Sequence, residues 1–262
     1  MVTLEEIVLN KRKELEKIKA GLPQKKLLAG IQHTKFIPRG FLKVITNGNG
    51  IRLITEIKKA SPSEGIIRED FNVMKIAECY EASGAAAISV LTESKYFLGR
   101  ASHLSMARQQ VNVPVLRKDF LIDRYQILES VALGCDAALL IVAVLEDKQL
   151  ADFIAELEQY KIDPLVEVHT EEELERALRA KAKIIGINNR NLKTMKIDME
   201  ISARLMKRMP SDIVAVAESG FETYDQIKRA ADLGVKAFLI GTSILKSESM
   251  EKKIKSLKGI PS

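Results

Sequence analysis

The stretch ALGCDAALLI, residues 132–141, joins the end of a helical pattern to the start of a strand pattern. Gly134 stands at the junction, and the apolar residues 137–141 follow it without interruption. A glycine at this point can adopt the left-handed conformation that ends a helix, and a continuous apolar run is typical of a strand buried on both faces. The stretch therefore predicts a helix that leads directly into a strand of a parallel sheet.

The same junction recurs in ASGAAAISV (82–90) and DLGVKAFLIG (232–241). Gly134 and Gly234 follow Gly84 at distances of 50 and 150 residues, and KAKIIGIN (181–188) falls near the missing step. Two strand–helix units per step correspond to about 25 residues per unit, so the chain after residue 50 accommodates about eight units. This repeat predicts a TIM (β/α)8 barrel. A doubly wound open sheet is the alternative, although it would not predict so even a repeat.

Short apolar runs after residue 50 supply the candidate strands, and stretches with helical periodicity separate them. Continuous apolar strands that alternate with single helices are the pattern of a parallel sheet covered by helices. The runs comprise residues 52–57, 86–91, 114–116, 137–145, 165–168, 184–187, 213–217 and 237–240.

The N-terminal segment lies outside this repeat and carries a helical pattern of its own. Its apolar stripe ends at the Gly-Leu-Pro sequence 21–23, and a second short helix is expected at about residues 24–29. We expect one domain overall, in which a helical extension (1–50) packs on a catalytic barrel (51–262). The stripe comprises Leu4, Ile7, Val8, Leu15 and Ile18.

The formal net charge of +6 is confined to the N-terminal segment. Residues 1–50 contain ten Lys/Arg and four Asp/Glu, whereas residues 51–262 contain 31 of each. The interleaved acids of KRKELEKIK (11–19) favour a solvated helix face over a polybasic arm, and no aromatic or Gly-rich RNA-binding motif accompanies them. We therefore expect no nucleic-acid partner, and the balanced charge elsewhere favours a monomer. Nucleic-acid binding through residues 1–50 is the non-enzymatic alternative.

The sequence carries no sign of export or membrane insertion. Cys79 and Cys135 stand in apolar surroundings and form no CxxC motif, which predicts reduced, buried thiols. No apolar run approaches the roughly 20 residues of a membrane span. The first 20 residues also lack the apolar core and the cleavage site of a secretory signal. We expect a cytoplasmic protein without a membrane partner.

Polar residues at the ends of the apolar runs are the candidate site, because TIM-barrel active sites lie at the C-terminal ends of the strands. Charges this close to a core cost several kcal/mol unless they are paired or used. Carboxylates that face lysines also suit acid–base chemistry. Any one residue could be an ordinary ion pair at the rim, but agreement among several strand ends favours a site. The candidates are Glu56, Lys58, Lys118, Glu167, Asn188, Arg190 and Glu218.

The stretch PVLRKDF (114–120) places three charges in a row at the end of a buried strand. Because side chains alternate across a strand, Lys118 and Phe120 are expected to face the barrel mouth. Arg117 and Asp119 are expected to face helices and loops, where they pair with neighbours.

The last two units indicate a phosphate site. AESGF (217–221) and LIGTS (239–243) each place a glycine and a small hydroxyl residue after a strand. Loops after strands seven and eight of many barrels bind phosphate through backbone N–H groups. His169 is a weaker candidate base, and no His/Cys/Asp cluster has metal-ligand spacing, so we predict no metal. The expected phosphate contacts are Ser219, Gly220, Gly241 and Thr242.

Six motifs follow one another along the chain: LITEIKKASPSEG (53–65), PVLRKDF (114–120), PLVEVHT (164–170), GINNRNL (186–192), VAESG (216–220) and FLIGTSIL (238–245). Together and in this order they resemble the indole-3-glycerol phosphate synthase family. The resemblance covers essentially the whole chain, including the N-terminal extension. It implies a cofactor-free step of tryptophan biosynthesis, in which ring closure, decarboxylation and dehydration convert 1-(2-carboxyphenylamino)-1-deoxyribulose 5-phosphate into indole-3-glycerol phosphate.

The resemblance also implies catalytic roles. Lys118 is the general acid that protonates the ribulose carbonyl, and Glu167 takes part in the later proton transfers that expel water. Glu56 and Asn188 position the amine and the hydroxyl groups. Which of Lys118 and Lys58 delivers each proton stays open.

Further residues are assigned to the substrate by the same resemblance. Lys58 and Ser61, with Arg190, hold the anthranilate carboxylate, and Glu218 orders the neighbouring network. Ser219 belongs to the catalytic set as well as to the phosphate site. Thr242 stands where relatives often carry Ser or Glu, but it keeps a hydroxyl and an N–H group. The implied ring contacts are Phe120, Leu139 and Leu192.

Other phosphosugar barrels are the alternative enzymes. Phosphoribosylanthranilate isomerase would need a Cys–Asp acid–base pair at the ends of the first and fifth strands, where this sequence carries Glu56, Lys58 and Glu167. A Schiff-base enzyme would use Lys118 as its nucleophile, and borohydride would trap the adduct.

Overall fold

Eight parallel strands close into a barrel in the computed structural model, which describes residues 2–32, 37–48, 50–191 and 194–261. The sheet order is β1-β10-β9-β8-β7-β6-β5-β4, and β1 closes the barrel by pairing with both β10 and β4. The predicted TIM barrel is therefore confirmed, and the open sheet is wrong. The barrel strands are β1 (Arg52–Ile57), β4 (Ala87–Leu91), β5 (Val115–Lys118), β6 (Ala137–Ile141), β7 (Asp163–Val168), β8 (Ile184–Asn188), β9 (Val214–Glu218) and β10 (Ala237–Ile240).

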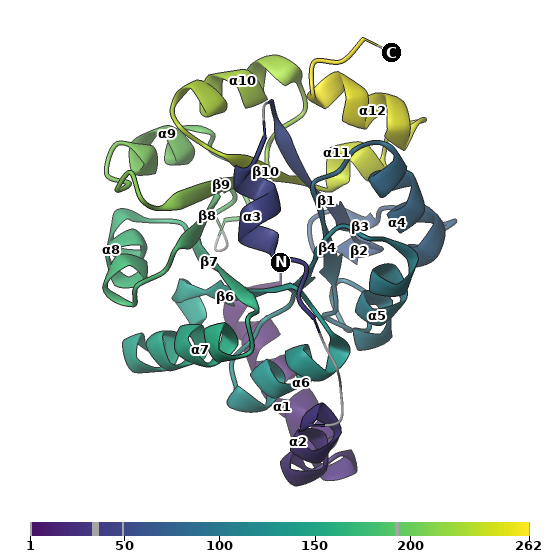
Figure 1. The fold of residues 1–262 in the computed structure, drawn as a ribbon, viewed down its shortest axis with the longest axis vertical. Helices are drawn as coiled ribbons and strands as arrows, with labels where there is room; N and C mark the ends of the chain where they lie inside the picture. The colour runs from purple at the N-terminus through teal and green to yellow at the C-terminus, as the bar shows by residue number, and fades with distance from the viewer. Residues whose placement is uncertain (1, 33–36, 49, 192–193, 262) are drawn as a thin grey trace.

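Helices surround the barrel and alternate with its strands (Figure 1). Gly84, Gly134 and Gly234 all have positive φ angles, of 81°, 76° and 104°, as the repeated junction predicts. A 3-10 turn, η1 (Val142–Val144), also follows β6. The helices are α4 (Val73–Ala82), α5 (Ala101–Gln110), α6 (Arg124–Leu133), α7 (Asp147–Gln159), α8 (Glu171–Arg179), α9 (Glu200–Met206), α10 (Tyr224–Asp232), α11 (Thr242–Leu245) and α12 (Met250–Leu257).

The hydrophobic core has two layers, as the alternation of side chains along each strand requires. On β1, Ile54 points into the barrel, whereas Leu53 and Ile57 point toward the surrounding helices. Further residues of the inner layer are Ala87, Leu116, Ala137, Leu139, Leu165, Ile184, Val216 and Leu239.

The N-terminal segment forms α1 (Leu4–Gly21) and α2 (Gln24–Gln32), so both predicted helices are present. Thr3 caps α1 through a capping box with Glu6. Leu15 and Leu27 pack in one cluster with Tyr125 of α6, which attaches the two helices to the outside of the barrel.

Two elements were missed by the sequence reasoning: helix α3 (Phe41–Thr46) and the β2–β3 hairpin (Ala60–Ser61 and Gly65–Ile66). Helix α3 lies across the N-terminal end of the barrel (Figure 1), where Phe41 and Ile45 are fully buried in the inner core. Six residues are too few for a helix stable by itself, so this docking stabilises it.

Some strand boundaries and one burial prediction also differ. Strand β5 continues to Lys118, and β6 ends at Ile141, four residues before the predicted end. Cys135 is buried as predicted, whereas Cys79 is only half-buried because it lies beside the buried face of α4. Both thiols are free. Among the described helices, none combines the length and the apolar character that crossing a lipid bilayer would need.

Candidate active site

A cavity of about 520 Å³ opens at the C-terminal ends of the barrel strands. Every described residue of the expected catalytic, substrate and phosphate sets lines it, whereas the weaker candidate His169 does not, and Leu192 lies outside the described residues. This set comprises Glu56, Lys58, Ser61, Lys118, Phe120, Leu139, Glu167, Asn188, Arg190, Glu218, Ser219, Gly220, Gly241 and Thr242.

Lys118, the last residue of β5, lies between two carboxylates from other strands. Its Nζ atom is 3.1 Å from Glu167 Oε2 and 2.9 Å from Glu218 Oε2. Burial by itself would lower the pKa of Lys118, but Glu167, Glu218 and Glu56 outweigh it and raise that pKa above its usual value. Lys118 is therefore an ammonium at neutral pH, which is the form of an acid and not of a nucleophile.

The two carboxyl groups beside Lys118 have opposite protonation behaviour. For Glu167, burial favours the neutral form, but Lys118 and then His169 outweigh it and lower the pKa below the usual range. For Glu218, burial raises the pKa to about 7, because Lys118 offsets it only in part and the neighbouring Glu167 charge adds to it. Two carboxyl groups whose pKa values are pushed apart are the arrangement that acid–base catalysis uses.

His169 is the residue of this network that sequence reasoning undervalued. Its Nε2 atom lies 3.3 Å from Glu167 Oε1, and its Nδ1 atom lies 3.1 Å from Glu173 Oε2 on α8. Burial lowers the pKa of His169, but the contacts with Glu167 and Glu173 outweigh it and raise the pKa to about 10. The imidazolium therefore stands behind Glu167, on the opposite side of that carboxylate from Lys118. The sequence carried one signal for this contact: His169 stands two residues after the candidate carboxylate Glu167.

A second ion pair stands at the end of β1, where Lys58 Nζ lies 2.6 Å from Glu56 Oε2. Gly241 faces this pair, because a β-carbon there would lie 2.5 Å from Glu56 Oε2. Gly241 therefore makes room for the Glu56 carboxylate. From the sequence, Gly241 was assigned to the phosphate site, and this second role was not predicted.

Asn188 and Ser219 form a hydrogen-bonded pair across β8 and β9. Ser219 Oγ donates to Asn188 Oδ1 at 2.8 Å, and the same oxygen accepts the backbone N–H of Arg190 at 3.0 Å. Because Oδ1 is engaged, the amide NH₂ of Asn188 is the group available to a ligand.

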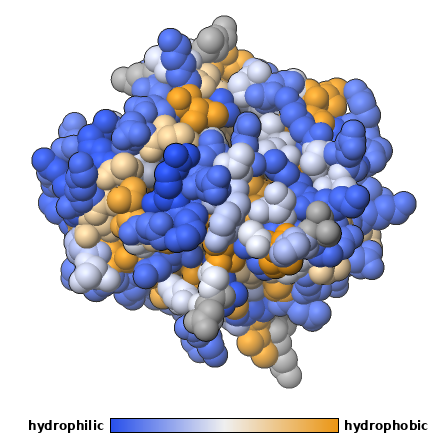
Figure 2. Space-filling model, turned by 90° about the horizontal axis from the view of Figure 1, so that it is seen from above, coloured by the Kyte–Doolittle hydropathy of each residue, from blue (hydrophilic) through white to orange (hydrophobic). Residues whose placement is uncertain are grey.

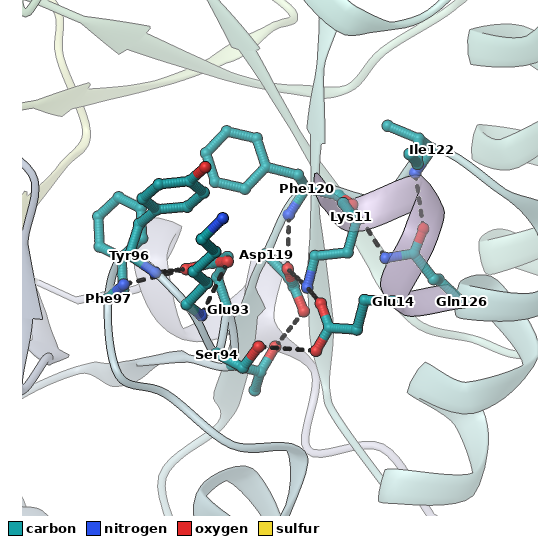
Figure 3. A network of polar contacts seen from close by, with 12 residues as sticks. Lys11, Glu14, Glu93, Ser94, Tyr96, Phe97, Asp119, Phe120, Ile122 and Gln126 are labelled. Atoms are coloured by element: carbon teal, nitrogen blue, oxygen red, sulfur yellow. Dashed lines mark hydrogen bonds and ion pairs between the residues drawn. The ribbon is translucent and has the colours of Figure 1, made fainter. Parts of the chain in front are cut away.

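Two aromatic rings form one wall of the cavity. Phe97 and Phe120 lie side by side with their ring centroids 6.2 Å apart (Figure 3). Phe97 was missed because it belongs to a loop and not to a strand end. The loop is held by Glu93, which is fully buried and accepts the backbone N–H groups of Tyr96 and Phe97 at 2.7 and 2.9 Å.

Arg117 and Asp119 face away from the cavity, as strand alternation predicts. Arg117 donates to Ser130 Oγ at 3.0 Å and pairs with Glu129 at 2.5 Å, both on α6. Asp119 Oδ1 lies 3.0 Å from the Nζ atom of Lys11, a buried residue of α1 (Figure 3). The N-terminal helix therefore contacts the strand end that carries Lys118.

Small residues that follow β9 and β10 line the cavity together with lysines from the end of α11 and from α12. Gly220 and Thr242 line it together with Lys246 and Lys253. Lys246 also pairs with Glu64, and Lys253 donates to the carbonyl of Glu222 at 2.8 Å. Small residues and ammonium groups on one wall suit an anion such as a phosphate group. Among the described residues, no group of His, Cys, Asp or Glu side chains is arranged to hold a metal ion.

The barrel and its mouth define a class of protein: a (β/α)8 enzyme with a lysine–carboxylate acid–base cluster beside an apolar wall and an anion-binding wall. A model of the indole-3-glycerol phosphate synthase family matches residues 4–257. The chain belongs to this family, which confirms the resemblance and the enzyme class, a carboxy-lyase, that the motifs implied.

Curated relatives of similar length carry the same family name. The indole-3-glycerol phosphate synthase of Caldanaerobacter subterraneus subsp. tengcongensis is 49% identical over 245 residues, which cover 94% of each chain. That of Acetivibrio thermocellus is 44% identical over 98% of this chain and 99% of the relative.

Solved structures with low identity share the fold alone. A thiamine phosphate pyrophosphorylase from Pyrococcus furiosus has a TM-score of 0.60 at 14% identity, covering 80% of this chain and 94% of its own. An N-acetylmannosamine-6-phosphate 2-epimerase from Clostridium perfringens has a TM-score of 0.61 at 15% identity, covering 85% and 97%.

Proposed function

We propose that this chain is an indole-3-glycerol phosphate synthase that converts 1-(2-carboxyphenylamino)-1-deoxyribulose 5-phosphate into indole-3-glycerol phosphate, CO₂ and water. The observation that carries the proposal is the position of Lys118, whose ammonium lies within 3.1 Å of Glu167 and Glu218 on the cavity wall. A cyclisation that protonates a carbonyl and then expels water needs one positioned acid and one positioned base within reach of the same carbon atoms.

In the first step, the ring carbon that bears the carboxylate attacks the ribulose C2 carbonyl. A C–C bond forms, and the carbonyl oxygen takes a proton from Lys118. Loss of CO₂ then returns the electron pair of the C–C bond to the ring and restores its aromatic character. Lys58, Ser61 and Arg190 supply the contacts for the carboxylate before it leaves, and Glu56 holds the Lys58 ammonium in place.

In the last step, the new hydroxyl group leaves as water and a proton leaves the adjacent methylene carbon. Glu167 is the base, because its low pKa keeps it ionised. Lys118 takes up a proton from solvent after the first step, and its restored ammonium lies close enough to Glu167 to protonate the departing hydroxyl group. Glu56 and Asn188 orient the amine and the hydroxyl groups of the substrate. Phe120 and Leu139 contact the anthranilate ring.

The raised pKa of Lys118 argues against the Schiff-base alternative, since a protonated amine is not a nucleophile. Borohydride should therefore trap no adduct in the presence of substrate.

The phosphate group is received at the ends of β9 and β10, by Ser219, Gly220, Gly241 and Thr242. Ser219 also belongs to the catalytic network, through its hydrogen bond to Asn188.

The test is the growth of indole fluorescence from the ribulose substrate, with and without a chelator. We expect turnover that the chelator leaves unchanged, because the proposed steps use protein groups alone. Absence of turnover under both conditions would refute the proposed function, and loss of turnover only with the chelator would refute the metal-free mechanism.

The monomeric state, the cytoplasmic location and the lack of nucleic-acid binding stay predictions. Figure 2 supports the monomeric state for one face, where hydrophilic side chains dominate and hydrophobic ones form small, separate groups. Light scattering of the purified protein, with and without added RNA, tests the first and the last.

A further inference from the structure

Asn189 follows Asn188 at the end of β8 and is fully buried. Successive residues of an extended segment point to opposite sides, and here Asn188 lines the cavity whereas Asn189 lies behind it, against α9. A buried carboxamide keeps its place only if its donors and acceptors are satisfied. Its contacts therefore indicate what it holds in position.

The side chain of Asn189 joins α9 to the loop after β9. Its Oδ1 atom accepts both the backbone N–H and the Oγ–H of Ser202, at 3.1 and 2.7 Å. Its Nδ2 atom donates to the backbone carbonyl of Ser219 at 3.1 Å. Both ends of the carboxamide are thus used, and Ser202 fixes its orientation.

The residue that Asn189 holds has an unusual backbone conformation. Ser219 has a φ angle of +66°, in the left-handed region that residues with a β-carbon seldom adopt, and Gly220 follows with +89°. Such a conformation persists only where the surroundings hold it. Asn188 binds the Ser219 hydroxyl group from the cavity side, and Asn189 binds the Ser219 carbonyl from behind.

The packing around Gly220 makes the same segment tight. A β-carbon on Gly220 would lie 2.5 Å from Met199 Sδ and 2.7 Å from Ile197 Cγ2. The backbone of residues 219–220 is therefore pressed against the segment that leads into α9, and the Asn189 carboxamide is its hydrogen-bonded attachment to that helix.

We propose that Asn189 is a positioning residue for the phosphate site: it holds the Ser219–Gly220 backbone so that its N–H groups face the anion. The inference rests on the proposed function and deepens it, because it assigns phosphate affinity to a residue that does not line the cavity. Loss of Asn189 should weaken ground-state binding of the phosphate group and leave the chemistry at Lys118 largely intact.

The test compares Asn189→Ala with the wild type in three measurements: turnover of the phosphorylated substrate, turnover of the same substrate without its phosphate group, and inhibition by inorganic phosphate. We expect the KM for the phosphorylated substrate and the Ki of phosphate to rise about tenfold, on the scale of one lost buried hydrogen bond, with kcat within about threefold of wild type. The unphosphorylated substrate should react equally well with both proteins. Asn112→Ala, an exposed asparagine at the other end of the barrel, is the matched control.

Equal losses with both substrates, or a lower kcat at unchanged KM, would overturn the proposal and indicate a general structural role. If Asn189→Ala does not fold, Ser202→Ala removes only one donor to the carboxamide and should raise the phosphate Ki about two- to threefold. An unchanged Ki in that variant would also overturn the proposal.

Failure of the proposed function is distinguishable from failure of this inference. If the wild type did not turn over the ribulose substrate, calorimetric binding of inorganic phosphate would still test Asn189. Equal phosphate affinity of the wild type and Asn189→Ala would then refute the inference by itself.

Discussion

Lys118 Nζ lies 2.9 Å from Glu218 Oε2, although the two residues are 100 positions apart in the chain. The contact spans the mouth of the barrel, from the end of β5 to the end of β9, and Glu167 of β7 approaches the same ammonium. Three strands therefore combine to set the protonation of one lysine.

Removal of either partner of the acid–base pair should abolish most of the activity. We expect Lys118→Ala and Glu167→Ala each to lower kcat by a factor of about 10² or more, the usual scale for a positioned acid or base. Indole fluorescence measures the rate, and circular dichroism checks the fold. Lys148→Ala, which changes an exposed lysine paired with Asp152, should keep the wild-type rate. A near-wild-type rate in either site variant would contradict the assigned role.

His169 should make stability depend on pH. Its pKa is raised from 6.5 to about 10 in the folded state, so its stabilising contribution is complete below pH 6.5 and is lost as pH rises toward 10. Glu218, raised to about 7, acts in the same direction but at lower pH. The free energy of unfolding of the wild type should therefore fall by on the order of a few kcal/mol between pH 7 and 10. The free energy of unfolding of His169→Gln should not show this fall.

Urea unfolding at pH 6.5, 8 and 10 measures this difference. His103→Gln is the matched control, because burial lowers the pKa of His103 and its replacement should leave the pH dependence in this range unchanged. Parallel curves for the wild type and His169→Gln would show that the imidazole is not held as a cation.

Gly186 on β8 should tolerate no β-carbon. A β-carbon there would lie 2.4 Å from Glu218 Oε1 and 3.4 Å from Leu165 Cδ1, so Gly186→Ala must displace the Glu218 carboxylate. We expect a lower kcat together with a loss of about 1–3 kcal/mol in the free energy of unfolding, as for other overpacked cores. Gly30→Ala on α2 is the control, because the new carbon would meet no described atom within 4 Å beyond its chain neighbours and the adjacent helix backbone. Unchanged kcat in Gly186→Ala would mean that the Glu218 position is not critical.

The buried ion pair between α1 and β5 should contribute strongly to stability. Lys11→Met leaves the Asp119 carboxylate, only 3% exposed, without one of its two cations, and should cost about 3–5 kcal/mol. Lys13→Met, on the exposed face of the same helix, should cost less than about 0.5 kcal/mol. Chemical denaturation measures both.

A double variant separates the charge from the packing. In Lys11→Met with Asp119→Asn, the uncompensated carboxylate is gone, so part of the lost stability should return. If the double variant is no more stable than Lys11→Met, the cost comes from packing and not from the unpaired charge.

Strand alternation accounts for most of the candidate site that could be predicted. A polar residue after an apolar run must emerge at the barrel mouth, which places Glu56, Lys118, Glu167 and Glu218 there before any contact is known. The missed residues act through loops or from behind. Phe97 is oriented by the buried Glu93, and no periodicity predicts a ring that a loop carries.

The sequence by itself determined the order of the strands and helices, the eightfold repeat and the side of each strand that faces the cavity. Those features depend on local geometry: the alternation of side chains along each strand, the glycines at helix ends, and apolar runs long enough to form buried strands. Helix α3 lacked such a signal, since its helical form depends on the core that Phe41 and Ile45 enter.

Only the tertiary structure decided which charges meet and which protons they hold. Glu167 and Glu218 have the same side chain and similar sequence surroundings, yet their pKa values shift in opposite directions. The difference arises because His169 adds a second positive partner to Glu167, whereas Glu218 shares Lys118 with the Glu167 charge. Distances across a closed barrel set those energies, because Coulomb interactions in a buried site depend on separation in space and not along the chain.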